Sequence, residues 1–292
     1  MKDKFIQHLK FEKRVSSNTI KSYGNDLKQF LSFSERYENS KEILSIDNRT
    51  IRAWIIELST KELSNNSINR KIASVKSFFK FLVKRKLIQK NPASLVQSLK
   101  TKQSLPLFIK ENDIIELFKN INITNSLEEI RTDLVLELLY GTGIRINELI
   151  NIKTKNFNFK KSEIKVLGKR NKERIIPLNN NIIIKTKLYL DHDKRKKYSN
   201  DFLLLTNKGK RIYPMMIYRM VKNCLSSLIN SEKYNPHLLR HSFATHILNR
   251  GADLNAIKDL LGHESLAATQ VYTHNSIEKL KETHKNSHPR AN

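Results

Sequence analysis

Glycine and proline are scarce in this chain, and their scarcity limits the folds that it can form. The 292 residues include only seven glycines and six prolines, where average usage would give roughly 35 of the two together. Sandwiches, barrels and propellers need many tight turns, which depend on these residues. A disordered chain rich in proline and glycine is disfavoured for the same reason. We therefore expect a fold built mainly of α-helices.

Apolar residues at helical spacing predict four helices in residues 1–88, which we assign to an N-terminal domain. The first helix is expected over about residues 2–14, and the second follows the N-cap cluster Ser16-Ser17-Asn18. In the second helix the apolar residues at 20, 23, 27, 30 and 31 share one face. A third helix is expected after Asp47 or Asn48, and a fourth over about residues 67–86.

The rest of the chain predicts a linker and a second, mixed domain. Residues 89–107 contain Pro92 and Pro106 and lack a strong period, so we assign them to the linker. Within the second domain, residues 108–292, the segments 163–167 and 174–178 predict two short strands around a polar turn, and 202–206 a third. Helices are expected at 111–120, 127–140, 145–151, 214–229, 237–249, 253–261, 266–272 and 276–283. The predicted fold class is mainly α with a small β-sheet or hairpin, as a four-helix domain followed by an α+β domain.

The net charge of +26 suggests a polyanionic partner. Nucleic acid is the first candidate and an anionic membrane surface the second, while a lysine bias from AT-rich coding is the alternative. Residues 67–90 carry eight basic side chains and no acidic one, whereas a solvated helix face normally mixes both signs. We therefore predict DNA-binding residues on the fourth helix and in the polar turn, namely Arg70, Lys76, Lys80, Lys84, Arg170 and Lys172.

Simple counts exclude several other classes of protein. Cys224 is the single cysteine, so neither an intrachain disulfide nor a zinc site made of cysteines is possible. No apolar stretch approaches the roughly 18 residues of a membrane span. The first residues are charged and contain no apolar run typical of a signal peptide. These features predict a cytoplasmic protein.

Four segments carry the candidate chemistry: 142–149 with Arg145, 168–174 with Lys169, 237–241 with His237 and Arg240, and 261–263 with His263, followed by Tyr272. Each is weak alone, because a hairpin lysine is usually solvated and a tyrosine near a chain end usually packs in the core. Together, and in this order, they resemble the signature of the tyrosine recombinase (lambda-integrase-like) family, Arg…Lys…His-x-x-Arg…His…Tyr. The resemblance spans nearly the whole chain. The segment lengths and the tail at residues 288–291 look most similar to the bacterial Xer subgroup.

The resemblance implies a SAM-like core-binding domain, a catalytic domain and a site-specific DNA recombinase. Such an enzyme cuts and rejoins DNA through a covalent 3′-phosphotyrosine, with no metal, ATP or other cofactor, as in the resolution of chromosome or plasmid dimers at cell division. The implied partners are a duplex DNA recombination site and a second, related Xer-type recombinase, in a tetramer on two duplexes. Residues 275–292 would then dock on the next protomer. The implied catalytic residues are Arg145, Lys169, His237, Arg240, His263 and Tyr272.

The residue types suit the cleavage of a phosphodiester. A free tyrosine has a pKa of about 10, so Tyr272 needs a general base, for which His237 is the candidate. Lys169 is the candidate general acid toward the leaving 5′-oxygen.

The two arginines suit the non-bridging phosphoryl oxygens, because a guanidinium group stays charged and presents forked donors. His263 would add a further donor. Glu148 follows Arg145 by three residues and either orients that arginine or is structural. We interpret His241 and His246 as structural or as lying near a phosphate, and not as catalytic.

Three other functions remain open at this point. An integrase of a mobile element would share the same chemistry, and a DNA-binding protein without catalytic activity could keep the fold. The third is a metal-dependent nuclease that uses His237 and His241. It would lack the HExxH spacing, because residues 238 and 239 are both leucine.

Overall fold

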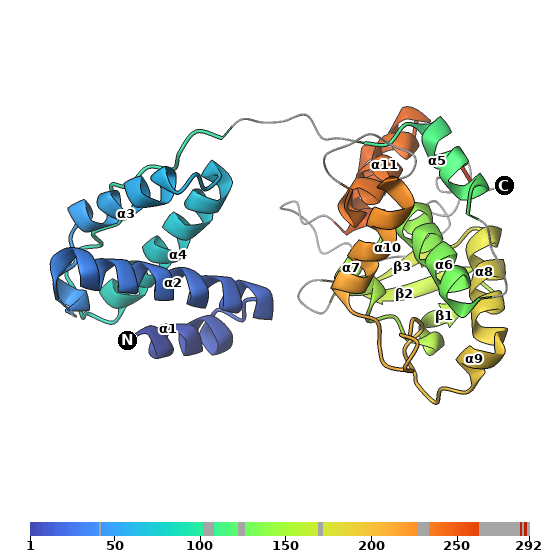
Figure 1. Cartoon of the computed structure of the whole chain (residues 1–292), viewed down its shortest axis with the longest axis horizontal. Coiled ribbons are helices and arrows are strands. Elements are labelled where there is room, and N and C mark those ends of the chain that lie inside the picture. Colours follow the sequence, from blue (N-terminus) through green and yellow to red (C-terminus); the bar gives the residue numbers. More distant parts are fainter. Residues whose placement is uncertain are drawn as a thin grey trace. The chain divides into compact units, whose positions relative to one another are not determined.

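The chain divides into two compact units, residues Met1–Ser104 and Leu105–Asn292, in a computed structural model (Figure 1). The structure describes residues 1–40, 42–101, 108–121, 126–168, 172–226, 234–262, 287 and 289–290. Each unit has its own hydrophobic core. The expected class, mainly helical with a small sheet, is confirmed.

The N-terminal unit is made of helices, as the sequence predicts. Its helices are α1 (Lys2–Gln7), which continues as a π-helical turn at His8–Glu12, then α2 (Ser17–Glu38), α3 (Asn48–Thr60) and α4 (Asn65–Lys84). The last three begin where a side chain caps the free backbone N–H groups of the first turn. Ser16 accepts from the Thr19 N–H at 3.2 Å, Asp47 from the Arg49 N–H at 2.7 Å and Ser64 from the Ser67 N–H at 3.4 Å.

Aromatic side chains fill the core of this unit. The Phe30 ring lies 5.0 Å from the Trp54 ring and 6.1 Å from the Phe79 ring, between centroids. Phe5 and Phe78 meet edge to face at 5.5 Å. The helices α2, α3 and α4 thus pack through aromatic pairs, which stabilise a core beyond the area that they bury.

Part of the segment that we assigned to a linker lies against the N-terminal unit. Ala93 and Val96 are buried in its core. Asn69 both accepts from the Leu99 N–H at 2.8 Å and donates to the Leu99 carbonyl at 2.9 Å. Asn48 donates to the Pro92 carbonyl at 2.9 Å. These bonds fasten the chain to α3 and α4 as far as residue 99, and the limits 89–107 for the linker stay a prediction.

The C-terminal unit surrounds a small antiparallel sheet with helices. The strands β1 (Phe157–Asn158), β2 (Glu163–Leu167) and β3 (Glu173–Pro177) lie in the order β1-β2-β3, and Lys165 pairs with Ile175. The helices are α5 (Glu111–Lys119), α6 (Leu127–Thr142), α7 (Ile146–Leu149), α8 (Asn180–Asp191), α9 (Asp193–Lys196), α10 (Pro214–Ser226), α11 (Pro236–Asn249) and α12 (Leu254–Leu261).

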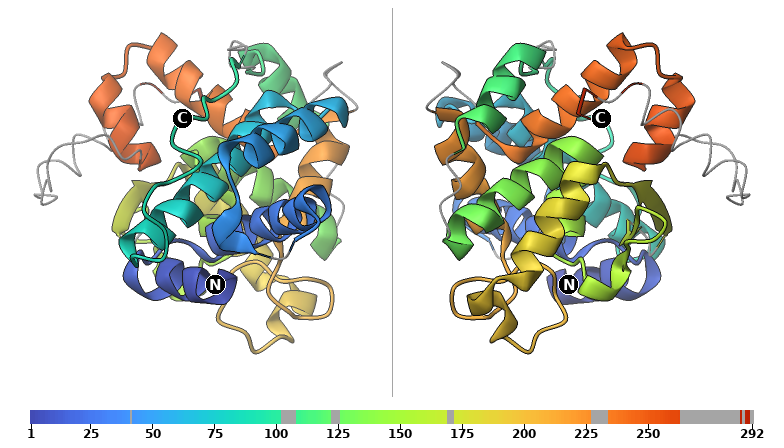
Figure 2. Two further views of the ribbon diagram at one scale, coloured as in Figure 1. Left: turned by 90° about the vertical axis from the view of Figure 1, so that its left-hand side faces the viewer. Right: turned by 90° about the vertical axis from the view of Figure 1, so that its right-hand side faces the viewer.

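Helix α6 lies at the centre of this unit. It is buried on nearly all sides, and α8 and α11 both pack along it (Figure 2). A helix that is buried on nearly all sides has no preferred exposed face and needs neighbours on every side. Its last residues lead directly into the segment that carries Arg145. The site is therefore built on the most enclosed element of the unit.

Four elements differ from the sequence predictions, and one of them is the four-residue helix α9, which is too short to give a periodic signal. We did not predict α8, since its run of β-branched isoleucines at 182–184 obscures the inward row Ile182, Thr186 and Tyr189. The strand expected at 202–206 is wrong, because Phe202 and Leu205 make only isolated bridges, to Lys153 and Arg211. The two-residue strand β1 was too short to detect. The helices expected at 266–272 and 276–283 lie outside the described residues.

The end of the described chain lies on the C-terminal unit. Arg290 donates to Glu137 of α6 at 2.9 Å, and its guanidinium lies 4.0 Å from the centroid of the Phe118 ring. The Asn179 side chain donates to the Arg290 carbonyl at 2.9 Å. None of the helices in the described ranges combines the length and the apolar character of a membrane span.

Truncating Phe79 should destabilise the N-terminal unit. Phe79 is 1% exposed, so Phe79→Ala leaves a cavity and should lower the free energy of unfolding by about 3–5 kcal/mol. Trp54, the only tryptophan in the sequence, reports on this unit through its fluorescence in a urea titration. Ile56→Ala, at a side chain that is 67% exposed, should change the same value by less than about 0.5 kcal/mol. Equal losses in the two variants would contradict the packing described.

Candidate active site

The segment that carries Arg145 begins with a sharp turn after α6. Gly143 ends that helix in the left-handed region at φ 59°, a conformation that favours glycine. A Cβ atom at this position would lie 2.5 Å from the Phe243 ring, so α6 and α11 approach too closely for any side chain here. The chain then turns into α7, and Arg145 is the residue before its first turn.

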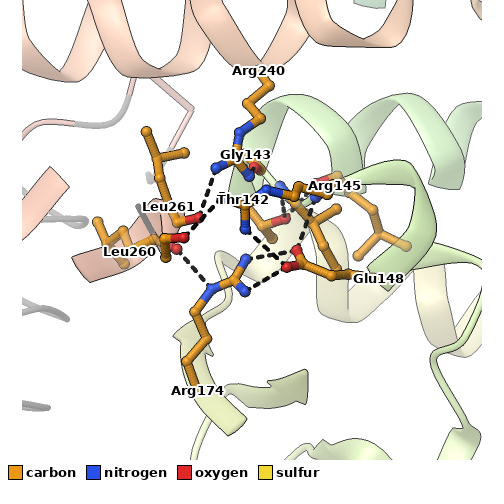
Figure 3. Close-up of polar contacts among 11 residues, drawn as sticks. Thr142, Gly143, Arg145, Glu148, Arg174, Arg240, Leu260 and Leu261 are labelled. Carbon is orange, nitrogen blue, oxygen red and sulfur yellow. Dashed lines mark hydrogen bonds and ion pairs between the residues drawn. The ribbon is translucent and has the colours of Figure 1, made fainter. Parts of the chain in front are cut away.

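Arg145 is held by Glu148 and by the end of α12 (Figure 3). Its backbone N–H donates to Glu148 Oε2 and its Nη1 to Glu148 Oε1, both at 3.0 Å. Its Nη2 donates to the Gly262 carbonyl at 2.8 Å. The Arg145 side chain remains 34% exposed, so it is fixed and still open to a ligand. Of the two interpretations of Glu148, the one in which it orients Arg145 is correct.

Arg240 reaches the same place from α11. It is buried and donates to the Gly143 carbonyl and, at 2.6 Å, to the Leu261 carbonyl. Burial and the nearby charge of Arg145 lower the pKa of the Arg240 guanidinium to about 9. The group is still protonated at neutral pH, but it lies in a strongly positive environment. An anion placed here would relieve that repulsion.

His237 lies one turn before Arg240, in the first turn of α11, and its side chain is exposed. Partial burial lowers the pKa of His237, and the positive charges of Arg240, His241 and Arg145 lower it further. The ring is therefore neutral at pH 7, the state in which imidazole accepts a proton. His241 is exposed. His246 is buried between the Tyr140 hydroxyl at 3.0 Å and the Ile109 carbonyl at 2.9 Å, a structural position as expected.

The structure thus brings together Arg145, Arg240 and the first turn of α11. Lys169, Arg170, His263 and Tyr272 lie outside the described residues. The described parts of the hairpin are its two strands and the close of its turn, where the Gly168 N–H donates to the Lys172 carbonyl at 2.7 Å. In the described ranges no three His, Cys, Asp or Glu side chains are grouped closely enough to hold a metal ion.

Sequence reasoning overlooked Arg174. The sequence analysis gives it no role, yet it is buried and donates to both oxygens of Glu148 at 2.8 Å. Burial would raise the pKa of Glu148, but the hydrogen bonds and charges of Arg174 and Arg145 outweigh it and keep that pKa below its usual value. One signal was available in the sequence: Arg174 lies two residues before Ile176, so in a strand the two side chains share the inward face.

The predicted DNA-binding residues of α4 differ in their surroundings. Arg70 pairs with the buried carboxylate of Asp26. Lys84 lies 3.9 Å from Glu12. Lys80 is exposed and Lys76 partly so, and neither has an acidic partner among the described residues. In the C-terminal unit Lys172 is exposed.

Comparisons with known proteins identify the family. The Phage integrase family matches residues 108–279, and the N-terminal SAM-like domain of phage integrases matches residues 3–86. The chain is 36% identical to tyrosine recombinase XerC of Oceanobacillus iheyensis, over 99% of this chain and 96% of that one. It is 35% identical to tyrosine recombinase XerC of Staphylococcus aureus, over 100% and 97%.

A likeness to solved structures agrees with the fold. The XerH site-specific recombinase bound to its palindromic difH substrate superposes with a TM-score of 0.72 at 22% identity, over 98% of this chain and 84% of that one. The sequence matches and the architecture of both units lead to one conclusion. The chain belongs to the phage integrase family and is a site-specific tyrosine recombinase.

Proposed function

We propose that this chain cuts and rejoins duplex DNA with Tyr272 as the nucleophile. The Tyr272 oxygen bonds to phosphorus while the bond to the 5′-oxygen breaks, which leaves a 3′-phosphotyrosine and a free 5′-hydroxyl. A 5′-hydroxyl from the partner strand then attacks the phosphotyrosine and releases the tyrosine. The phosphoester is conserved throughout, so the cycle needs neither ATP nor a metal ion.

The main support for this proposal is the convergence of Arg145 and Arg240 on the backbone just before His263. Both guanidinium groups are fixed by carbonyl acceptors, and each has five N–H donors. The N–H groups that remain, together with His263, would stabilise the charge that develops on the phosphoryl oxygens. Fixed donors need no reorganisation during the reaction.

The proton transfers are assigned to His237 and Lys169. His237, which is neutral at pH 7, would take the phenolic proton of Tyr272. Lys169 would give a proton to the leaving 5′-oxygen. In the second half of the cycle the two groups exchange roles: Lys169 takes the proton of the attacking hydroxyl and His237 returns one to Tyr272.

The assembly follows from the same proposal. Arg70, Lys76, Lys80 and Lys84 of the core-binding domain, with Arg170 and Lys172 of the catalytic domain, would contact the phosphates of the recombination site. Four protomers would act on two duplexes, together with a second Xer-type recombinase. Residues 275–292 would dock on the next protomer, and this docking requires Arg290 to leave the contacts that it makes with Glu137 and Asn179 of its own chain. The cellular role would be the resolution of chromosome or plasmid dimers in the cytoplasm at cell division.

The test is a covalent protein–DNA adduct. DNA fragments recovered by chromatin immunoprecipitation supply the site, and a nick beside the scissile phosphate traps the intermediate. Wild-type protein should form an adduct that resists denaturant and is unchanged by EDTA, and Tyr272→Phe should form none.

Each alternative gives a different result in this assay. A DNA-binding protein without activity would give no adduct, and a metal-dependent nuclease would cut without an adduct and stop in EDTA. An adduct in Tyr272→Phe would reject the nucleophile. A mobile-element integrase would give the adduct at element ends rather than at a chromosomal site.

The rate of cleavage should depend on pH through His237. Because the pKa of His237 is lowered, the base stays neutral to a lower pH. The midpoint of the acid limb of the single-turnover rate should therefore lie below about pH 6.5. The charge of His241 contributes to that lowering, so His241→Gln should move the limb to higher pH. His192→Gln, at the start of α9, serves as the control and should leave the limb unchanged. An acid limb above 6.5 in the wild type would contradict the assignment of the base.

Binding of DNA should depend on salt through Lys76 and Lys80. Each neutralised phosphate contributes about 0.9 to the slope of log affinity against log salt, so Lys76→Ala with Lys80→Ala should reduce the slope by about 1.8. Affinities are measured with Tyr272→Phe to prevent cleavage. Lys61→Ala removes a lysine that already pairs with Glu57 and should leave the slope nearly unchanged. Equal slopes in the double variant and the parent would show that Lys76 and Lys80 of α4 do not contact phosphates.

A further inference from the structure

Three arginines cap the carboxyl end of α12, each on a different carbonyl (Figure 3). The Leu260 carbonyl accepts from Arg174 Nε at 3.0 Å, the Leu261 carbonyl from Arg240 Nη2 at 2.6 Å and the Gly262 carbonyl from Arg145 Nη2 at 2.8 Å. The last carbonyls of a helix have no partner within it and carry partial negative charge. The three guanidinium groups satisfy them just before His263.

Arg174 differs from the other two arginines in its second partner. Its Nη1 and Nη2 donate in parallel to the two oxygens of Glu148, each at 2.8 Å. Its side chain is 6% exposed and that of Glu148 is 5% exposed. Glu148 in turn accepts from the backbone and the side chain of Arg145. A single planar group therefore joins the end of α12 to the carboxylate that fixes Arg145.

Two glycines lie against the guanidinium group of Arg174. A Cβ atom at Gly262 would lie 3.2 Å from Arg174 Nη1, and one at Gly168 would lie 3.5 Å from the same atom. Gly168 directly precedes Lys169 in the sequence, and Gly262 directly precedes His263. Arg174 thus lies against the backbone from which two of the proposed catalytic residues continue.

We propose that Arg174 is a positioning residue of this active site. Through Glu148, the Leu260 carbonyl and the glycines at 168 and 262, it holds Arg145, the residue before Lys169 and the residue before His263 in one fixed arrangement. It is buried, so it acts on the reaction through these groups and not by contact with DNA. This inference rests on the proposed function.

The role requires arginine rather than a positive charge alone. Arg174 uses three N–H groups from one rigid fork, on acceptors in two directions. A lysine presents a single ammonium on a flexible stem and cannot reproduce the parallel pair to a carboxylate. Arg174→Lys therefore keeps the charge and loses the geometry.

The test compares Arg174→Lys with Arg131→Lys. Arg131 is another buried arginine of the same unit, and it donates to the Leu205 carbonyl and the Asn207 side chain. Single-turnover formation of the covalent adduct is measured at saturating DNA, with the folded fraction determined for each protein. Arg174→Lys should lower the rate per folded molecule by about 10²-fold, the effect of a displacement of about 1 Å. Arg131→Lys should leave that rate within about twofold of wild type.

A second measurement separates positioning from general loss of structure. Affinity for the intact site, measured in the Tyr272→Phe background, should be unchanged by Arg174→Lys. If Arg174 acts through Glu148, the rate losses caused by Glu148→Gln and by Arg174→Lys should not multiply in the double variant. The double variant should then cleave about as slowly as the slower single variant.

Three results would overturn the inference. The first is that Arg174→Lys forms the adduct as fast as the wild type, while the wild type forms it normally. This result would reject the role of Arg174 and leave the proposed function intact. The second is an equal loss of rate in Arg131→Lys, which would show a general structural effect. The third is no adduct in the wild type itself, which would reject the proposed function together with this role.

Discussion

The buried carboxylate of Glu148 lies among arginines, and the geometry of the candidate active site depends on it. A carboxylate taken out of water is strongly unfavourable unless it is paired and hydrogen-bonded. Here it accepts from Arg174, from the side chain of Arg145 and from the Arg145 backbone. Glu148 therefore offsets part of the repulsion between the two arginines and fixes the one that stays exposed.

Positive charge nevertheless exceeds negative charge at this place. The lowered pKa of Arg240 reflects burial and the charge of Arg145, and the remaining acceptors are neutral carbonyls at the end of α12. Carbonyl dipoles orient a guanidinium group without neutralising it. The cluster is thus rigid before any ligand arrives and still attracts an anion, which is the preorganisation that phosphoryl transfer requires.

How far the sequence predicts the structure depends on how local each signal is. The amphipathic stripes and the caps Ser16 and Asp47 lie within one or two turns of chain, so the helices of the N-terminal unit were predicted from sequence. The helix α8 was not predicted, because its buried row is visible only once α6 is known to lie against it. Arg174 was overlooked for a related reason. An arginine in a basic hairpin is usually solvated, and its burial depends on Glu148, 26 residues away.

The sequence by itself determined the order and spacing of the motifs, the excess of positive charge and the helical class, because these are properties of residue types along the chain. Only the tertiary structure decided that Arg145, Arg174 and Arg240 share the end of one helix. Their acceptors there are backbone carbonyls, 117, 86 and 21 residues away in sequence. Every residue has a carbonyl group, so no pattern of side chains marks these acceptors, and only the packing of α7, β3 and α11 around α12 selects them.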